Sequence, residues 1–141
     1  PIEKGVILLA SHINQVEHLL QNLQPAVREQ IIETWTNRTL TDRATTWLLP
    51  ADEHIPTWIK GDHPKVAVRV TTHPLCVALC NAFNGFIVST SANPAGLEPA
   101  RSLQDANQYF NFEINYLNGD LGLGTEPSKI LDAESGNIIR A

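Results

Sequence analysis

The amino-acid sequence predicts a single α/β domain built on a mixed sheet with flanking helices. Segments with strand-like alternation and segments with helical spacing follow one another along the chain, which is the pattern of an α/β fold. A chain of 141 residues has the usual size of one domain, and 43% of hydrophobic residues is enough to bury a core. The run Phe86–Ser91 carries a buried strand directly into small hydroxyl side chains, which is typical of strand ends in such sheets.

The first half of the chain predicts two strands and two helices. Val6–Ala10 is expected to be a buried strand because it is short and apolar. Asn14–Asn22 and Pro25–Thr36 are expected to be helices, and the proline that opens the second suits a first helical turn. Thr45–Leu49 is a predicted strand that ends at a proline, and Ile55–Lys60 is a short apolar turn.

The middle of the chain predicts a strand, a helix, a strand and a further helix. Lys65–Val70 alternates as a strand does, and Pro74–Asn84 is a helix opened by proline and closed by Asn-Gly. Phe86–Ser91 is the strand described above. Ser102–Asn111 is a helix with its serine as N-cap and an aspartate three residues later, a variant of the capping box.

The last part of the chain predicts an edge strand, a loop and a hairpin. Glu113–Leu117 is expected to form the edge strand. Gly119–Gly124 is interpreted as a flexible glycine-rich loop, because it matches neither phosphate-binding glycine motif. Ser128–Asp132 and Asn137–Arg140 are expected to pair as a hairpin around a turn at residues 134–136.

The composition argues against a membrane-bound, secreted or metal-binding protein. No apolar run approaches the ~20 residues that a membrane-spanning helix needs, and no charged-then-apolar leader opens the chain. We therefore expect a cytoplasmic protein with no membrane partner. Cys76 and Cys80 match neither a redox pair nor a metal-ligand spacing, so we interpret them as reduced core thiols.

The polar strand end after Phe86 permits two interpretations. Ser91 and Asn93 offer hydrogen-bond donors and acceptors at the edge of a sheet, where open α/β sheets bind ligands. The same residues are typical of a strand that ends in an Asx turn, because Asn-Pro often starts a turn. Their chemistry leaves both interpretations open.

A set of motifs spread over the whole chain resembles one protein family. Val66–Pro74 reads Val-Ala-Val-Arg-Val-Thr-Thr-His-Pro, and Ser89–Gly96 reads Ser-Thr-Ser-Ala-Asn-Pro-Ala-Gly. Four further segments match in the same order, namely Pro1–Leu9, Thr45–Ala51, Pro127–Asp132 and Ile138–Arg140. Together they resemble the threonylcarbamoyl-AMP synthase family, also called YrdC-like or TsaC.

The resemblance implies a YrdC-like fold, a single twisted, mixed and largely antiparallel sheet with flanking helices. It covers residues 1–141 as one YrdC-like domain. In the family a further strand and a Pro-Thr-Glu-Thr loop precede the position of Pro1, and we expect this chain to lack them. Those elements carry substrate ligands, so the resemblance leaves the activity of this chain open.

The family joins L-threonine, bicarbonate and ATP to form threonylcarbamoyl-AMP and pyrophosphate, so the resemblance implies a nucleotidyltransferase. Its product feeds the threonylcarbamoyladenosine modification of tRNA, which makes tRNA and the downstream transfer complex expected partners. Such a step depends on positioning and on positive charge near the phosphates, so no catalytic acid, base or nucleophile is expected. Mg²⁺ is expected with ATP, held by phosphates and water and without a dedicated protein ligand.

The resemblance also assigns binding roles to individual residues. The expected ATP-binding residues are Lys4, Thr46, Ser91, Asn93 and Arg140. The expected threonine-binding residues are Arg69, Ser89 and Ser128. Arg69 also suits its role chemically, because a guanidinium binds a carboxylate through two parallel hydrogen bonds, although an ion pair on an edge strand is the alternative. Arg43-Ala44 stands where the family has Gly-Pro, which changes the loop before Thr46.

The chain is acidic as a whole, but several of its basic residues lie in the motifs. The net charge of −5 argues against binding of nucleic acid over the whole surface. Local positive charge in the motifs suits a small polyanion instead, and it comes from Lys4, Lys65, Arg69 and Arg140. The principal alternative is an RNA- or nucleotide-binding module of the same fold without synthase activity. A carbamoyl-transfer domain, like that of hydrogenase maturation proteins, is the other alternative.

Overall fold

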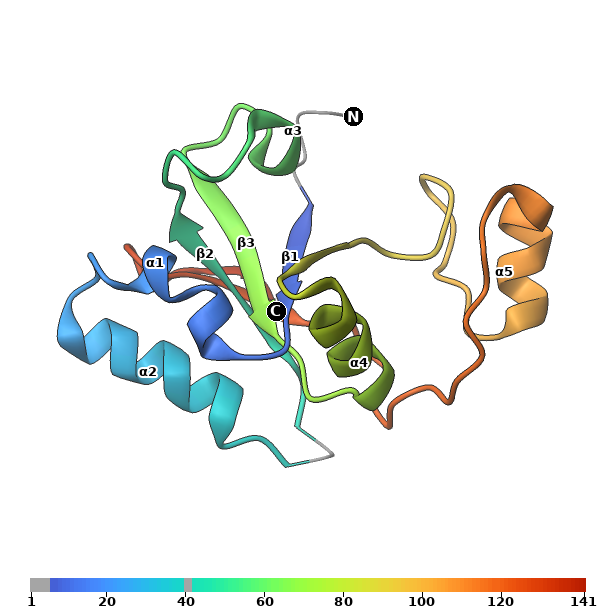
Figure 1. Cartoon of the computed structure of the whole chain (residues 1–141), viewed down its shortest axis with the longest axis horizontal. Helices are drawn as coiled ribbons and strands as arrows, with labels where there is room; N and C mark the ends of the chain where they lie inside the picture. The colour runs from blue at the N-terminus through green and yellow to red at the C-terminus, as the bar shows by residue number, and fades with distance from the viewer. Residues whose placement is uncertain (1–5, 40–41) are drawn as a thin grey trace. The chain divides into compact units, whose positions relative to one another are not determined.

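The computed structural model describes residues 6–39 and 42–141 and contains a six-stranded mixed sheet (Figure 1). The strands are β1 (Ile7–Ala10), β2 (Thr45–Pro50), β3 (Lys65–Val70), β4 (Ile87–Ser89), β5 (Lys129–Asp132) and β6 (Ile138–Arg140). Their order across the sheet is β4-β1-β3-β2-β5-β6. The pairs β1/β3 and β2/β5 are parallel, and the other three pairs are antiparallel. The predicted fold class, a mixed sheet with helices, is confirmed.

The chain divides into two compact units, which are described separately. The first holds the sheet and comprises residues 1–89 and 123–141; the second comprises residues 90–122. The helices of the first unit are η2 (Ile13–Gln15), α1 (Glu17–Leu20), α2 (Pro25–Thr36), α3 (Thr57–Lys60) and α4 (Pro74–Phe83). Those of the second are α5 (Leu103–Phe110) and η3 (Asn111–Glu113).

Strand alternation sends one set of side chains into the main core. Val66, Val68 and Val70 of β3 are buried there, together with alternate residues of β1 and β2 and with apolar side chains of α1 and α2. The indole nitrogen of Trp35 on α2 donates to the backbone oxygen of Thr45 at 3.0 Å. This bond satisfies the polar end of a buried aromatic ring and fixes α2 against β2.

A different helix packs on the opposite face of the sheet. In Figure 1, α2 lies on one side of β3 and α4 lies on the other. The Cys80 thiol of α4 lies 3.4 Å from the backbone oxygen of Leu9, and both residues are buried. Cys76 and Cys80 are both free, as expected, and burial raises the pKa of the Cys80 thiol. The helix ends at Asn84, whose left-handed conformation forms the predicted Asn-Gly cap.

Two predicted elements are wrong. The helix expected at Asn14–Asn22 is a short 3-10 turn followed by the one-turn α1, and Gln15 accepts a hydrogen bond from the Ser11 backbone at 2.8 Å. The edge strand expected at Glu113–Leu117 is instead the end of η3 followed by irregular chain. Tyr116 lies in that chain, and its hydroxyl donates to the Asn111 and Ala106 backbone oxygens. These bonds tie the segment to α5 and not to a strand.

The N-cap predicted for the helix of the second unit is confirmed. The Ser102 hydroxyl accepts a hydrogen bond from the backbone N–H of Asp105 at 3.0 Å. The carboxylate of Asp105 in turn accepts from the backbone N–H of Arg101 at 3.2 Å. The first bond satisfies a backbone donor of the first turn, which has no partner inside the helix, and the second holds the residue that precedes the N-cap.

An ion-pair cluster connects the end of β5 to the start of β3. The Lys65 ammonium lies 2.7 Å from carboxylate oxygens of both Asp132 and Glu134. Asp132 is the better buried of the two carboxylates, with 12% of its side chain exposed against 55% for Glu134. Burial opposes ionisation of Asp132, but hydrogen bonds from Lys65 and the Glu134 backbone outweigh it and hold its pKa below the ordinary value of 3.8.

We expect Asp132→Asn to lower the free energy of unfolding by about 2 kcal/mol at pH 7, because the negative charge and one acceptor oxygen of a buried carboxylate are lost. A carboxyl whose folded pKa is depressed stabilises the protein above its unfolded pKa and loses that effect as pH falls through the folded value. The gap between wild type and variant should therefore narrow below pH 3.8. Urea unfolding of both proteins between pH 7 and pH values below 3.8 measures this difference in the free energy of unfolding. The matched control, Glu134→Gln, should change stability by under ~1 kcal/mol, and a gap independent of pH would contradict the assignment.

Candidate functional site

The register of the sheet places several predicted site residues in one row on the face opposite the main core. Arg69 of β3 pairs with Leu9 of β1. Thr46 of β2 pairs with Ile130 of β5, which in turn pairs with Arg140 of β6. The β2/β3 register brings Thr46 next to Arg69, because the residue after Thr46 pairs with the residue before Arg69. Residues opposite one another in a sheet share a face, so Arg69, Thr46 and Arg140 face the same side.

A buried pair of hydroxyls lies within this row. Thr46 Oγ1 and Ser128 Oγ are 2.8 Å apart, and either can donate. The side chains are well buried, since Thr46 is 0% exposed and Ser128 is 4% exposed. Arg140 donates to the Ser128 backbone oxygen from Nε at 3.0 Å and from Nη2 at 2.7 Å. Its Nη2 also lies 3.2 Å from the Ser128 hydroxyl. The structure thus brings together three of the predicted site residues.

Arg69 is a partly buried cation on a central strand. Its Nε atom is buried and has no hydrogen-bond partner. Burial lowers the pKa of the Arg69 guanidinium, the charges of Arg38 and Arg140 lower it further, and Cys76 acts in the opposite direction. Strand β3 lies between β1 and β2, so the alternative of an ion pair on an edge strand is wrong. A desolvated cation among like charges favours binding of an anion.

Ser89 lies on the same face but is displaced from the row by two residues along β4. It is on β4 two residues after Ile87, which pairs with Leu9, the partner of Arg69. Two-residue spacing keeps Ser89 on the face of Ile87, and its side chain is partly exposed. The sheet therefore orders Ser89, Arg69, Thr46 and Arg140 across one face.

The remaining predicted ligands are not joined to this row by the structure. Ser91 and Asn93 belong to the second unit, where Ser91 is exposed. The Asn93 amide nitrogen donates to the backbone oxygens of Pro94 at 3.1 Å and Leu97 at 2.8 Å, so its side chain shapes a turn. The Asn93 Oδ1 atom is buried without a partner. Lys4 lies outside the described residues.

Sequence reasoning missed two arginines near the row. Arg43 precedes β2 and binds the backbone oxygens of Pro127 at 2.6 Å and Ala141 at 2.8 Å. Arg38 is close enough to Arg69 for its charge to lower the Arg69 pKa. Arg43 was recognised only as a departure from a Gly-Pro turn. Its partners lie far away in the sequence, and no local pattern identifies them.

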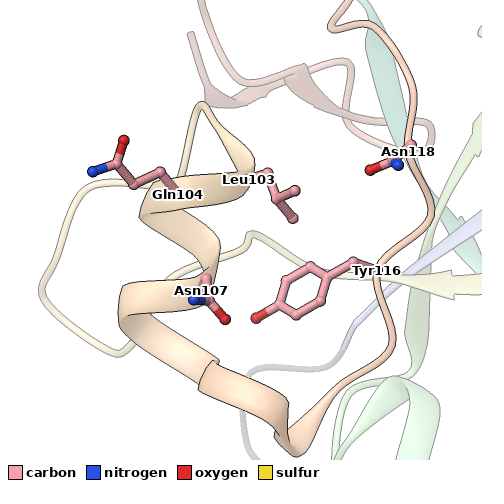
Figure 2. Close-up of a pocket in the computed structure, with 5 residues that line it drawn as sticks. All are labelled: Leu103, Gln104, Asn107, Tyr116 and Asn118. Carbon is pink, nitrogen blue, oxygen red and sulfur yellow. The ribbon is translucent and has the colours of Figure 1, made fainter.

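A hollow in the second unit is a separate feature. Figure 2 shows the five residues that line it, Leu103, Gln104, Asn107, Tyr116 and Asn118. The Tyr116 side chain points toward α5 in this view, and its hydroxyl is held by two backbone oxygens. None of the predicted site residues lines the hollow. Among residues 6–39 and 42–141, no three His, Cys, Asp or Glu side chains are grouped to hold a metal ion.

Within residues 6–39 and 42–141, no helix is both long enough and apolar enough to cross a membrane.

The fold and the row define the class of protein as a mixed α/β domain with arginines and hydroxyls on one sheet face, and comparison with known proteins identifies the family. The family model for Sua5, YciO and YrdC, described as "Telomere recombination", matches residues 1–141. The chain belongs to the Sua5/YciO/YrdC family. The resemblance seen in the motifs is confirmed.

Curated relatives carry a functional name. A protein of Acinetobacter baumannii (strain ATCC 17978) named threonylcarbamoyl-AMP synthase is 70% identical over 99% of this chain and 74% of its own length. Proteins of the same name from Acinetobacter baylyi and Cellvibrio japonicus are 65% and 40% identical over 99% of this chain, which spans 73% and 71% of them.

Solved structures share the fold at low sequence identity. A P. abyssi Sua5 structure described as complexed with L-threonine has a TM-score of 0.80 and 22% identity. The match covers 94% of this chain but 37% of that one. E. coli YciO has a TM-score of 0.77 and 17% identity, over 99% of this chain and 66% of that one.

The hydroxyl pair generates a stability prediction. Thr46→Val and Ser128→Ala each remove one hydroxyl, and we expect a coupling of about 1 kcal/mol between them in a double-mutant cycle, because the second change costs little once the bond is gone. Urea unfolding of the four proteins measures the coupling. Thr36→Val is the matched control, since the Thr36 hydroxyl donates to the Ile32 backbone oxygen on α2. The stability changes caused by Thr36→Val and Ser128→Ala should add without coupling. Equal coupling in both cycles would contradict the bond.

Proposed function

We propose that this protein is an L-threonylcarbamoyladenylate synthase, which forms threonylcarbamoyl-AMP and pyrophosphate from L-threonine, bicarbonate and ATP. Relatives up to 70% identical over 99% of the chain carry the name threonylcarbamoyl-AMP synthase. A structure of the same fold is described as complexed with L-threonine. The sequence motifs that match the family include the strand carrying Arg69 and the segment from Ser89 to Gly96.

The observation that carries the proposal is the buried Nε atom of Arg69, which lacks a hydrogen-bond partner. Neighbouring arginines add positive charge around the Arg69 guanidinium. A carboxylate would pair with such a group through charge-assisted hydrogen bonds and offset the cost of its burial. We assign the L-threonine carboxylate to Arg69, with the Ser89 and Ser128 hydroxyls as further contacts of the amino acid.

The proposed reaction has two bond-forming steps. The threonine amine attacks the bicarbonate carbon, and loss of water leaves a carbamate. A carbamate oxygen then attacks the α-phosphorus of ATP, and the bond to the β-phosphate oxygen breaks as pyrophosphate leaves. Neither step requires an oxidant or a covalent enzyme intermediate. The contribution of the protein is to align the carbamate with the α-phosphorus and to place positive charge near the phosphates.

The nucleotide is assigned to the Arg140 side of the row. Arg140 and the Thr46 hydroxyl are proposed as ATP contacts. The motif resemblance separately assigns ATP-binding roles to Lys4, Ser91 and Asn93. The buried and unpartnered Oδ1 of Asn93 is an acceptor suited to a nucleotide donor group. Mg²⁺ is proposed to enter with ATP and to supply charge neutralisation, with phosphate oxygens and water as its ligands.

The remaining partners follow from the chemistry of the product. Threonylcarbamoyl-AMP is an activated acyl donor, so a transfer step must consume it. We propose that a downstream threonylcarbamoyl-transfer complex passes the group to tRNA in the cytoplasm.

Pyrophosphate release by the full-length protein tests the function. Release should require ATP, L-threonine and bicarbonate together. Arg69→Met should lower kcat/KM for L-threonine by at least ~100-fold, because a desolvated carboxylate would lose its partner. Arg69→Lys should restore little of this loss, because an ammonium cannot form the planar two-bond contact. ATP binding by calorimetry should change by under ~3-fold in both variants.

Arg28→Met is the matched control for these variants. Arg28 pairs with Glu17 on the α1 and α2 side of the sheet, away from the row. The activity of the Arg28→Met variant should equal that of wild type. Release that does not depend on threonine, or full activity of Arg69→Met, would contradict the proposed function. ATP binding without any release would favour the nucleotide-binding alternative.

A further inference from the structure

The Arg43 guanidinium contacts three other residues of the protein, two of them through their backbone oxygens. Nε donates to the Pro127 backbone oxygen at 2.6 Å, and Nη2 donates to the Ala141 backbone oxygen at 2.8 Å. Nη1 lies 3.7 Å from a carboxylate oxygen of Glu126. Only 23% of the Arg43 side chain is exposed. Two of its nitrogen atoms are thus used to hold backbone oxygens in place.

The backbone that Arg43 holds carries two residues of the row. Pro127 directly precedes Ser128, and Ala141 directly follows Arg140. Ser128 and Arg140 are also bonded to one another through the Ser128 backbone oxygen. Arg43 therefore fixes both ends of this contact from the segment that leads into β2.

The segments concerned need an external restraint. Strand β6 has three residues, all exposed, and it lies at the edge of the sheet. Its register with β5 is irregular between Ile130 and Leu131. Residues 121–127, which lead into β5, are exposed. Short exposed edge strands open at low free-energy cost, so strand pairing alone leaves the position of Arg140 loosely defined.

The chemistry of arginine suits this role. A guanidinium presents several donors in a rigid plane, so one side chain can bind two backbone oxygens that belong to different segments. The positive charge of Arg43 also acts on Arg140. Burial lowers the pKa of the Arg140 guanidinium, and repulsion from Arg43 lowers that pKa further. That repulsion makes an anion beside Arg140 more favourable.

We propose that Arg43 is a positioning residue of the site, whose bonds to the backbone oxygens of Pro127 and Ala141 hold Ser128 and Arg140 in the geometry that binds substrate. The inference rests on the proposed function, since it assigns a role within the same site. Arg43 acts through Ser128 and Arg140 and touches neither substrate.

Steady-state kinetics of the full-length protein tests the proposal. We expect Arg43→Met to lower kcat/KM for ATP by 10- to 100-fold, mostly through KM, because misplacement of a binding group weakens both ground and transition states. Arg43→Lys should restore under a third of the loss, since it keeps the charge without the fork. Arg28→Met, a partly exposed arginine far from the row, is the control and should match wild type.

A double-mutant cycle separates positioning from general stability. In an Arg140→Met background, Arg43→Met should cost under ~3-fold, because the residue through which it acts is already lost. An equal loss in both backgrounds would overturn the proposal, as would kinetics of Arg43→Met within twofold of wild type. Thermal unfolding of each variant confirms that the assays use folded protein.

Equilibrium ATP binding keeps the two proposals apart. If wild type binds ATP but releases no pyrophosphate with threonine and bicarbonate, the proposed function fails. Weaker ATP binding by Arg43→Met than by Arg28→Met would then still support the positioning role. Equal ATP binding by the two variants would overturn it.

Discussion

The register of the central strands is the constraint on which the candidate site depends. Valines alternate along β3 and are buried against the helices, so Arg69 between them must face the other way. A slip of one residue would drive a guanidinium into the main core and turn the valines outward, which would combine a charge-burial cost with lost apolar burial. The hydrophobic pattern that stabilises the sheet therefore also orients Arg69 beside Thr46. Folding and site placement are decided by the same alternation.

The site concentrates positive charge in a protein that is acidic as a whole. The chain has a net charge of −5 with ten lysines and arginines, and four of those arginines act on one another around the row. Their mutual repulsion and partial burial disfavour the charged forms, as the lowered pKa values of Arg69 and Arg140 show. An anionic ligand reverses both effects at once. The surrounding acidity disfavours non-specific binding of large polyanions, so this charge distribution suits a small anion better than a nucleic acid.

Local patterns predicted most elements, and non-local contacts explain the failures. The β3 alternation, the Ser102 N-cap and the terminal hairpin are encoded within a few residues, and each is confirmed. The edge strand expected at residues 113–117 failed because the Tyr116 hydroxyl bonds back to α5, which propensity does not register. Thr46, Ser128 and Arg140 were named from motifs, and the structure brings them together. Arg43 was missed because its partners Pro127 and Ala141 are 84 and 98 residues away.

The departure at Arg43 and Ala44 has a structural rationale. Where the family pattern has Gly-Pro, a proline restricts the backbone before the strand through its fixed φ angle. This chain lacks that restraint, and the Arg43 guanidinium instead binds two backbone oxygens on other segments. A side-chain clamp restrains three segments at once, whereas a proline restrains one. It also couples the entry to β2, which carries Thr46, to the segments that carry Ser128 and Arg140. The substitution therefore replaces local rigidity with rigidity shared across the site.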